Sequence, residues 1–170
     1  MSALFERIRA LAFGGAPHVS TVTQSRGGAV TAKLDVELLR ASFDLVVTRE
    51  PELTHRFYEI LFERHPQVKP LFRPARRKEQ ERMLAEALGA VVDHLEDAAW
   101  LSGTLEALGQ KHVDYGVRDE MYAWVGEALL CTLAEIAGKQ WSPQLERAWA
   151  GAYEAIAAMM RAGAAKVARG

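Results

Sequence analysis

Apolar side chains recur at helical spacing from Leu34 onward, in stripes separated by glycine, proline and charged residues. The main stripes are Leu39, Phe43, Val46 and Val47; Leu53, Phe57, Ile60 and Leu61; Leu84, Leu88, Val91 and Val92; Tyr122, Val125, Leu129, Leu133 and Ile136; and Leu145, Trp149, Ala152, Tyr153, Ile156 and Met160. No stretch alternates with a period of two over the length of a strand, and no short repeat occurs. The pattern predicts an all-α fold.

The ends of several predicted helices are marked by local sequence. His65-Pro66 closes the second helix, because proline cannot continue a helical hydrogen-bond ladder. Gly116 ends the helix predicted over Ser102 to Tyr115, and Gly138 ends the helix that follows it. Ser142, followed by proline, supplies a cap and a first-turn residue for the last helix.

The first 33 residues differ from the rest of the chain. Leu4, Phe5, Ile8 and Leu11 form one side of a short amphipathic piece, and a tract rich in Gly, Ser and Thr follows. A piece of about twelve residues is marginal as a free helix, so we expect it to dock on its own domain or to fray. The tract is typical of a flexible linker. We therefore expect an amino-terminal extension over residues 1–33 and a helical domain over residues 34–165.

Length and composition limit the function classes. A chain of 170 residues suffices for one domain with a sizeable core. Its net charge of -1, with 25% charged residues, indicates neither a basic nucleic-acid surface nor an acidic tail. Cys131 is the only cysteine, which excludes an internal disulfide and a thiolate metal cluster. We expect no nucleic-acid partner and a reducing compartment.

Nothing in the hydropathy pattern indicates a membrane protein. No apolar run approaches the roughly 20 residues that a spanning helix needs. Glu6, Arg7 and Arg9 interrupt the apolar stretch that could serve as a signal peptide. We expect a cytoplasmic protein without a transmembrane segment.

One histidine carries the candidate chemistry. Leu105, Leu108 and His112 share one helix face at i, i+3 and i+7, which places an imidazole on an apolar surface. From this helix alone two interpretations stay open, a metal ligand and a core histidine with satisfied hydrogen bonds. On the helix before it, Gln80 begins an otherwise apolar stripe. The basic run from Arg73 to Lys78 is interpreted as a solvated loop rather than a site for an anionic partner.

Several motifs in this order resemble the globin family. They are Phe57-Tyr58 with Phe62, Pro66 and Leu71-Phe72; Gln80-x-Arg82-x-Leu84; Leu108-Gly109-x-Lys111-His112-x-x-x-Gly116-Val117; Val125-Gly126-Glu127-x-Leu129-Leu130; and Ala148-Trp149-x-x-x-Tyr153. The chain is most similar to bacterial single-domain globins related to the globin half of flavohaemoglobins, and it is also similar to neuroglobin. The resemblance implies a three-over-three helical sandwich that binds haem b (iron protoporphyrin IX).

The resemblance also implies a role for each site residue. His112 becomes the proximal iron ligand, and a single neutral imidazole keeps the sixth position open for a diatomic gas. Phe72 packs on the porphyrin, Tyr58 and Gln80 donate hydrogen bonds to dioxygen, and Leu84 forms an apolar wall over the ligand. Further expected haem contacts are Leu108, Val117, Tyr122 and Val125.

Two departures from the family pattern limit these implications. Flavohaemoglobins support the proximal histidine with a tyrosine and a carboxylate; Tyr122 matches the tyrosine, but Ala164 stands in the place of the acid. The imidazole is then less anionic, which weakens the case for peroxidase-type activation. The placement of Gln80 assumes one extra residue after Phe72; without it, Glu79 takes the distal place.

Three functions compete. The first is reversible, high-affinity dioxygen binding for storage, transport or sensing, with NO and CO as further ligands. The second is nitric oxide dioxygenation, in which Tyr58 and Gln80 would serve catalysis and a separate flavin reductase would be the partner, because we expect no built-in reductase. The third is a haem-free interaction domain of the stress-sensor type, against which His112, Tyr58 and Gln80 argue. A monomer or a homodimer fits all three.

Overall fold

The computed structural model describes residues 35–49 and 53–167. The chain divides into two units, residues 1–33 and 34–170, and the described residues all belong to the second. The predicted amphipathic piece and linker lie outside the described residues. Within the described ranges, no helix is long and apolar enough to cross a membrane.

The described residues are helical apart from their connections, as the pattern predicted, and they contain no strand. The α-helices are α2 (Val36–Arg49), α3 (Leu53–Arg64), α4 (Arg77–Asp93), α5 (Ala98–Asp114), α6 (Asp119–Ala137) and α7 (Pro143–Val167). Short 3-10 helices η1 (Pro66–Leu71), η2 (Pro74–Arg76) and η3 (Gly138–Gln140) connect some of them.

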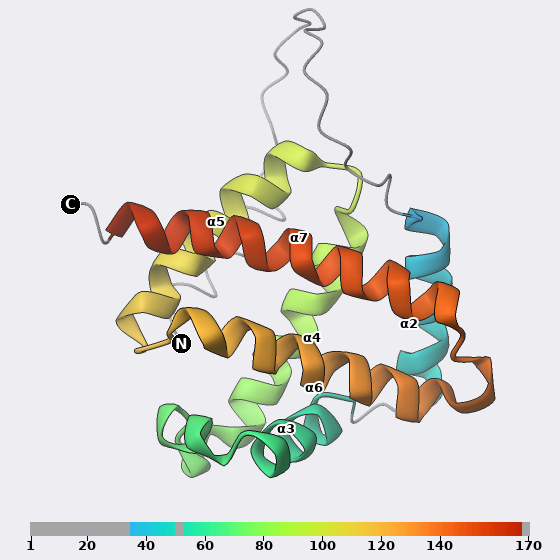
Figure 1. The fold of residues 1–170 in the computed structure, drawn as a ribbon, viewed down its shortest axis with the longest axis horizontal. Coiled ribbons are helices and arrows are strands. Elements are labelled where there is room, and N and C mark those ends of the chain that lie inside the picture. Colours follow the sequence, from blue (N-terminus) through green and yellow to red (C-terminus); the bar gives the residue numbers. More distant parts are fainter. Residues whose placement is uncertain (1–34, 50–52, 168–170) are drawn as a thin grey trace, which may run out of the picture. The chain divides into compact units, whose positions relative to one another are not determined.

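The helices cross one another in layers (Figure 1). Helices α6 and α7 lie side by side, and α4 passes behind them in this view. Helix α5 crosses α7 near the carboxyl end of α7, and α2 packs near its beginning. Helix α3 packs against α6 and α4. This arrangement lets side chains from α3, α4, α5 and α6 reach the interior.

Most predicted helix ends are confirmed, and one is wrong. Gly116 and Gly138 take positive φ angles of 80° and 56° after α5 and α6, a conformation that favours glycine. Ser142 Oγ accepts a hydrogen bond from the backbone N–H of Leu145 at 3.2 Å, which caps α7. Helix α5, however, begins at Ala98 rather than Ser102, because Asp97 caps it by accepting a hydrogen bond from the backbone N–H of Trp100.

The buried side chains form two clusters. The larger cluster draws on α2, α3, α4, α6 and α7, and a hydrogen bond from Trp149 Nε1 to Ser42 Oγ, 3.0 Å long, ties α7 to α2 inside it. The smaller cluster contains Leu101, Leu105, Tyr122, Ala157 and Met160. Because Tyr58 belongs to the larger cluster and Tyr122 to the smaller one, the predicted site residues are divided between the two.

Candidate functional site

His112 lies in the last turn of α5, and one of its two ring nitrogens is already hydrogen-bonded. Its Nδ1 is 2.9 Å from the backbone oxygen of Leu108, so it donates a proton to that carbonyl. Burial lowers the pKa of the imidazole and favours the neutral ring. In the neutral ring with Nδ1 protonated, Nε2 carries a lone pair, and no residue in the described part of the chain bonds to it. This is the state in which an imidazole ligates a metal.

Tyr122 lies beside this imidazole. The two rings stack with centroids 6.4 Å apart and planes at 25°. The backbone oxygen of Tyr122 accepts a hydrogen bond from the Tyr153 hydroxyl at 2.6 Å, which joins α6 to α7. The guanidinium of Arg161 lies 5.3 Å from the centre of the Tyr122 ring and pairs with Asp119 at 2.8 Å. A cation therefore approaches Tyr122 from α7, three residues before Ala164, which stands in the place of the expected acid.

The other predicted contact residues are partly buried and line both clusters. Leu108, on α5, and Val117, just after that helix, pack against the smaller cluster. Phe72, Leu84 and Val125 pack against the larger one. The structure thus places apolar side chains from α4, α5, α6 and the connection after η1 around the interior.

Tyr58 anchors a group of three aromatic rings, with Phe62 and Phe72, that we call the aromatic cluster. The Tyr58 ring meets the Phe72 ring edge-on, with centroids 5.4 Å apart, and stacks on Phe62 at 5.8 Å. Only 6% of Tyr58 is exposed, and this burial raises the pKa of its phenol to about 12. The phenol therefore stays protonated at neutral pH and remains a hydrogen-bond donor.

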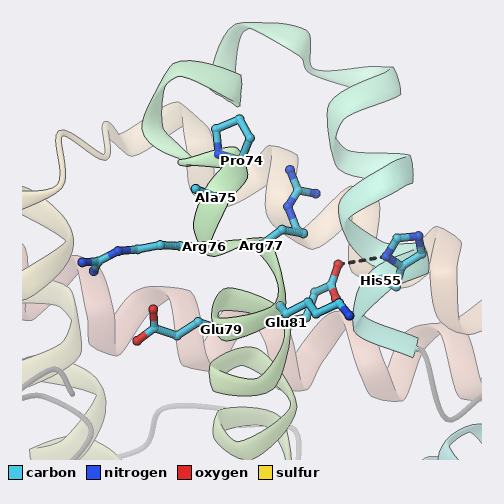
Figure 2. Close-up of a pocket in the computed structure, with 8 residues that line it drawn as sticks. His55, Pro74, Ala75, Arg76, Arg77, Glu79 and Glu81 are labelled. Carbon is cyan, nitrogen blue, oxygen red and sulfur yellow. Dashed lines mark hydrogen bonds and ion pairs between the residues drawn. The ribbon is translucent and has the colours of Figure 1, made fainter.

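Gln80 lies on the first turns of α4, and its amide oxygen is unpartnered. Its Oε1 is buried and has no hydrogen-bond partner among the described residues. A buried polar atom without a partner is costly and marks a candidate binding position. Glu79, the alternative distal residue, lines a surface cavity instead (Figure 2). The geometry favours Gln80 over Glu79 for a role in the interior.

Arg77 departs from the sequence-based interpretation of the basic run as a solvated loop. It is the first residue of α4, and its guanidinium carbon lies 5.0 Å from the centre of the Tyr58 ring and 4.3 Å from that of Phe62. The spacing of basic residues could not single it out, because the sequence does not show which arginine in the run meets the aromatic rings. Cation–π contacts hold Arg77 on the aromatic cluster.

Metal binding in this site would depend on one side chain. In the part of the chain that the structure describes, no group of three or more His, Cys, Asp or Glu residues could hold a metal ion. A metal bound through His112 alone would need its remaining ligands from a cofactor. The single free imidazole nitrogen and the partly buried apolar surface around it fit a flat, metal-bearing organic group.

Comparisons with known proteins give a family match and several similar proteins. The family model described as Globin matches residues 55–160. The Flavohemoprotein of Vibrio cholerae serotype O1 is 31% identical over 120 residues, which make up 69% of this chain and 30% of that protein. The chain thus spans about a third of the length of the curated relatives it matches.

Two solved bacterial structures show the same fold over nearly their whole length. A bacterial globin from Campylobacter jejuni is 25% identical, with a TM-score of 0.69, over 79% of this chain and 97% of that one. An engineered carbene transferase, made from a protein assigned as a nitric oxide dioxygenase in Rhodothermus marinus, is also 25% identical. Its TM-score is 0.71, over 81% of this chain and 96% of that one.

Proposed function

Because the chain belongs to the globin family, we propose that it binds haem b through His112 and uses it to bind dioxygen reversibly. The observation that carries the proposal is the neutral imidazole of His112, whose Nδ1 donates to Leu108 and whose Nε2 remains available. Haem iron held by one imidazole supplies a position at which a small gas ligand binds.

The residues present fit haem on chemical grounds. Phe72 offers an aromatic ring and Leu84, Leu108, Val117 and Val125 offer apolar surface, which suits the faces of a porphyrin. Gln80, whose amide oxygen is buried without a partner, supplies a polar group on the α4 side. A site of this kind is apolar with a few placed polar groups, as expected for a cofactor pocket.

Tyr58 and Gln80 would distinguish dioxygen from less polar gases. A protonated phenol and an amide can both donate hydrogen bonds, and donors in a dry environment act more strongly than in water. Leu84, one turn after Gln80, would restrict the space over the ligand. We therefore propose that Tyr58 and Gln80 donate hydrogen bonds to the bound dioxygen. We also propose NO and CO as further ligands. The proposed location is the cytoplasm.

A second candidate function is nitric oxide dioxygenation with a separate flavin reductase. The structural likeness to the Rhodothermus marinus protein and the homology to flavohemoproteins support it. The same pocket would serve both functions, since each needs dioxygen held by polar donors. Multi-turnover consumption of nitric oxide, with a reductase added and with the reductase omitted, separates the two. Turnover that depends on the reductase favours the enzyme, and a single stoichiometric reaction favours the binding protein.

Haem titration tests the proposal. Adding haem to the protein should produce a Soret band that saturates at one haem per chain, and His112→Ala should abolish it or leave haem that is easily lost. His94→Ala is the matched control, because His94 Nδ1 bonds to the Ala90 carbonyl at 2.8 Å in the same local geometry, while its ring stacks on Trp100. Equal haem retention in the two variants would contradict His112 as the ligand.

A further inference from the structure

Arg161, on α7, places a guanidinium on the ring that stacks on His112. Its guanidinium carbon lies 5.3 Å from the centre of the Tyr122 ring, and the centres of the Tyr122 and His112 rings are 6.4 Å apart. Helix α7 lies beside α6 and crosses α5 (Figure 1), so α7 carries the cation while α6 and α5 carry the two rings. A cation, an aromatic ring and the proposed iron ligand are thus successive neighbours.

The carboxylates that pair with Arg161 do not cancel its charge at the Tyr122 ring. Arg161 pairs with Asp119 at 2.8 Å and with Glu154 at 3.5 Å. These two acidic side chains are 78% and 73% exposed, whereas that of Arg161 is 31% exposed. Water and salt screen exposed charges more than partly buried ones. Burial raises the pKa of the Tyr122 phenol, and Arg161 opposes this shift more strongly than Asp119 adds to it. The net charge felt at the ring is positive.

Other contacts hold the two rings in place when the charge of Arg161 is removed. Tyr122 is buried, and its backbone oxygen accepts the 2.6 Å hydrogen bond from the Tyr153 hydroxyl. His112 is held by the 2.9 Å bond between its Nδ1 and the Leu108 carbonyl. A substitution at Arg161 therefore removes a charge and a cation–π contact but leaves both of these hydrogen bonds.

We propose that Arg161 is a positioning residue, which uses the Tyr122 ring to hold a positive charge beside the proximal histidine and thereby raises the reduction potential of the haem iron. The inference rests on the proposed haem binding through His112. A nearby positive charge disfavours ferric iron, which carries one more positive charge than ferrous iron. Dioxygen binds the ferrous state, so Arg161 favours the oxidation state that the proposed function needs. The acid expected at position 164 would act with the opposite sign.

A spectroelectrochemical titration of the haem-loaded protein tests the proposal. Arg161→Met keeps an apolar stem and removes the charge, so it should lower the equilibrium constant for one-electron reduction about three- to tenfold. At 59 mV per tenfold change for one electron, the midpoint potential falls by about 30 to 60 mV. Arg161→Lys keeps the charge and should stay within about twofold of wild type.

Arg147→Met is the matched control on the same helix. Arg147 is exposed and lies fourteen residues before Arg161, about 21 Å along α7 at roughly 1.5 Å per residue. Its removal should change the equilibrium constant less than about twofold, because its charge is screened. Equal midpoint potentials in Arg147→Met and Arg161→Met would overturn the proposal. An equal fall in Arg161→Lys and Arg161→Met would overturn it too, since the effect would then not follow the charge.

Two further variants test the sign and the role of the ring. Asp119→Asn removes the paired carboxylate and should raise the midpoint potential, so an unchanged or lowered potential would contradict the proposal even if Arg161→Met fails to fold. In a Tyr122→Leu background, Arg161→Met should have a smaller effect, because the ring that holds the guanidinium is gone. Equal effects in the two backgrounds would overturn the role of Tyr122. Failure of haem binding itself would instead appear as a missing Soret band in wild type.

Discussion

Gly109 on α5 lies directly against the backbone of Met160 on α7. A Cβ atom at position 109 would overlap the Met160 carbonyl group, so no side chain fits there without moving a helix. His112 lies one turn further along α5. We predict that Gly109→Ala lowers the free energy of unfolding by about 1 to 3 kcal/mol through overpacking and loosens the haem.

Chemical denaturation of the wild type and two alanine variants measures this effect. Gly103 is the control, because it lies on the same helix and a Cβ there meets nothing within 4 Å. Gly103→Ala should stabilise the protein by about 0.5 to 1 kcal/mol, since alanine favours a helix more than glycine does. Equal stability of the two variants would show that the α5–α7 contact is not close.

The distal pair is predicted to slow dioxygen release. Tyr58→Phe and Gln80→Leu each remove a donor while keeping most of the side-chain volume. If each hydrogen bond contributes about 1.5 to 3 kcal/mol, each loss speeds release roughly ten- to a hundredfold. Flash photolysis or stopped-flow mixing measures the rate, and carbon monoxide release should change little. The two effects should be non-additive, because both donors share one acceptor.

Glu79→Leu tests, in the same assay, whether Gln80 or Glu79 is the distal residue of α4. Glu79 lines the surface cavity, whereas the Gln80 amide oxygen is buried. Dioxygen release should therefore be unchanged in Glu79→Leu. A fast release in Glu79→Leu together with a normal rate in Gln80→Leu would shift the distal position by one residue.

The Tyr58 phenol is predicted to ionise at a higher pH than an ordinary tyrosine does. Burial raises its pKa from 10.0 to about 12, and the positive charge of Arg77 opposes this shift. Between pH 10 and about 12, the folded state therefore keeps the phenol proton while the unfolded state loses it. The contribution of this group to the free energy of unfolding is complete below pH 10 and is lost as the pH rises toward 12. An ultraviolet titration that compares wild type with Tyr58→Phe should reveal the late ionisation. A phenol that titrates near pH 10 would mean that Tyr58 is exposed.

Local sequence was sufficient to predict most of the fold. Apolar spacing identified the helices from α2 to α7, and the chemistry of glycine and serine located the ends at Gly116, Gly138 and Ser142. The start of α5 was missed, although Leu101 lies four residues before Leu105 and is buried with it, because Asp97 was not identified as the residue that caps the helix. There the cap, rather than the stripe, decides where the helix begins.

The candidate site could be predicted only in part, for physical reasons. His112 and Gln80 stood out because a polar residue on an apolar stripe is visible in one helix. Arg77 and Arg161 did not, since their importance comes from rings on other helices, Tyr58 and Phe62 for the first and Tyr122 for the second. Contacts between distant segments of this kind leave no periodic signal in the sequence.

The optical spectrum of the ferrous protein, before and after dioxygen is admitted, tests the central claim most directly. His112 is the proposed protein ligand, and His94 is engaged by Ala90 and Trp100. We predict a five-coordinate, high-spin ferrous spectrum that changes to an oxygenated spectrum and returns when dioxygen is removed. A low-spin, six-coordinate ferrous spectrum, or oxidation without an oxygenated form, would contradict reversible dioxygen binding at His112.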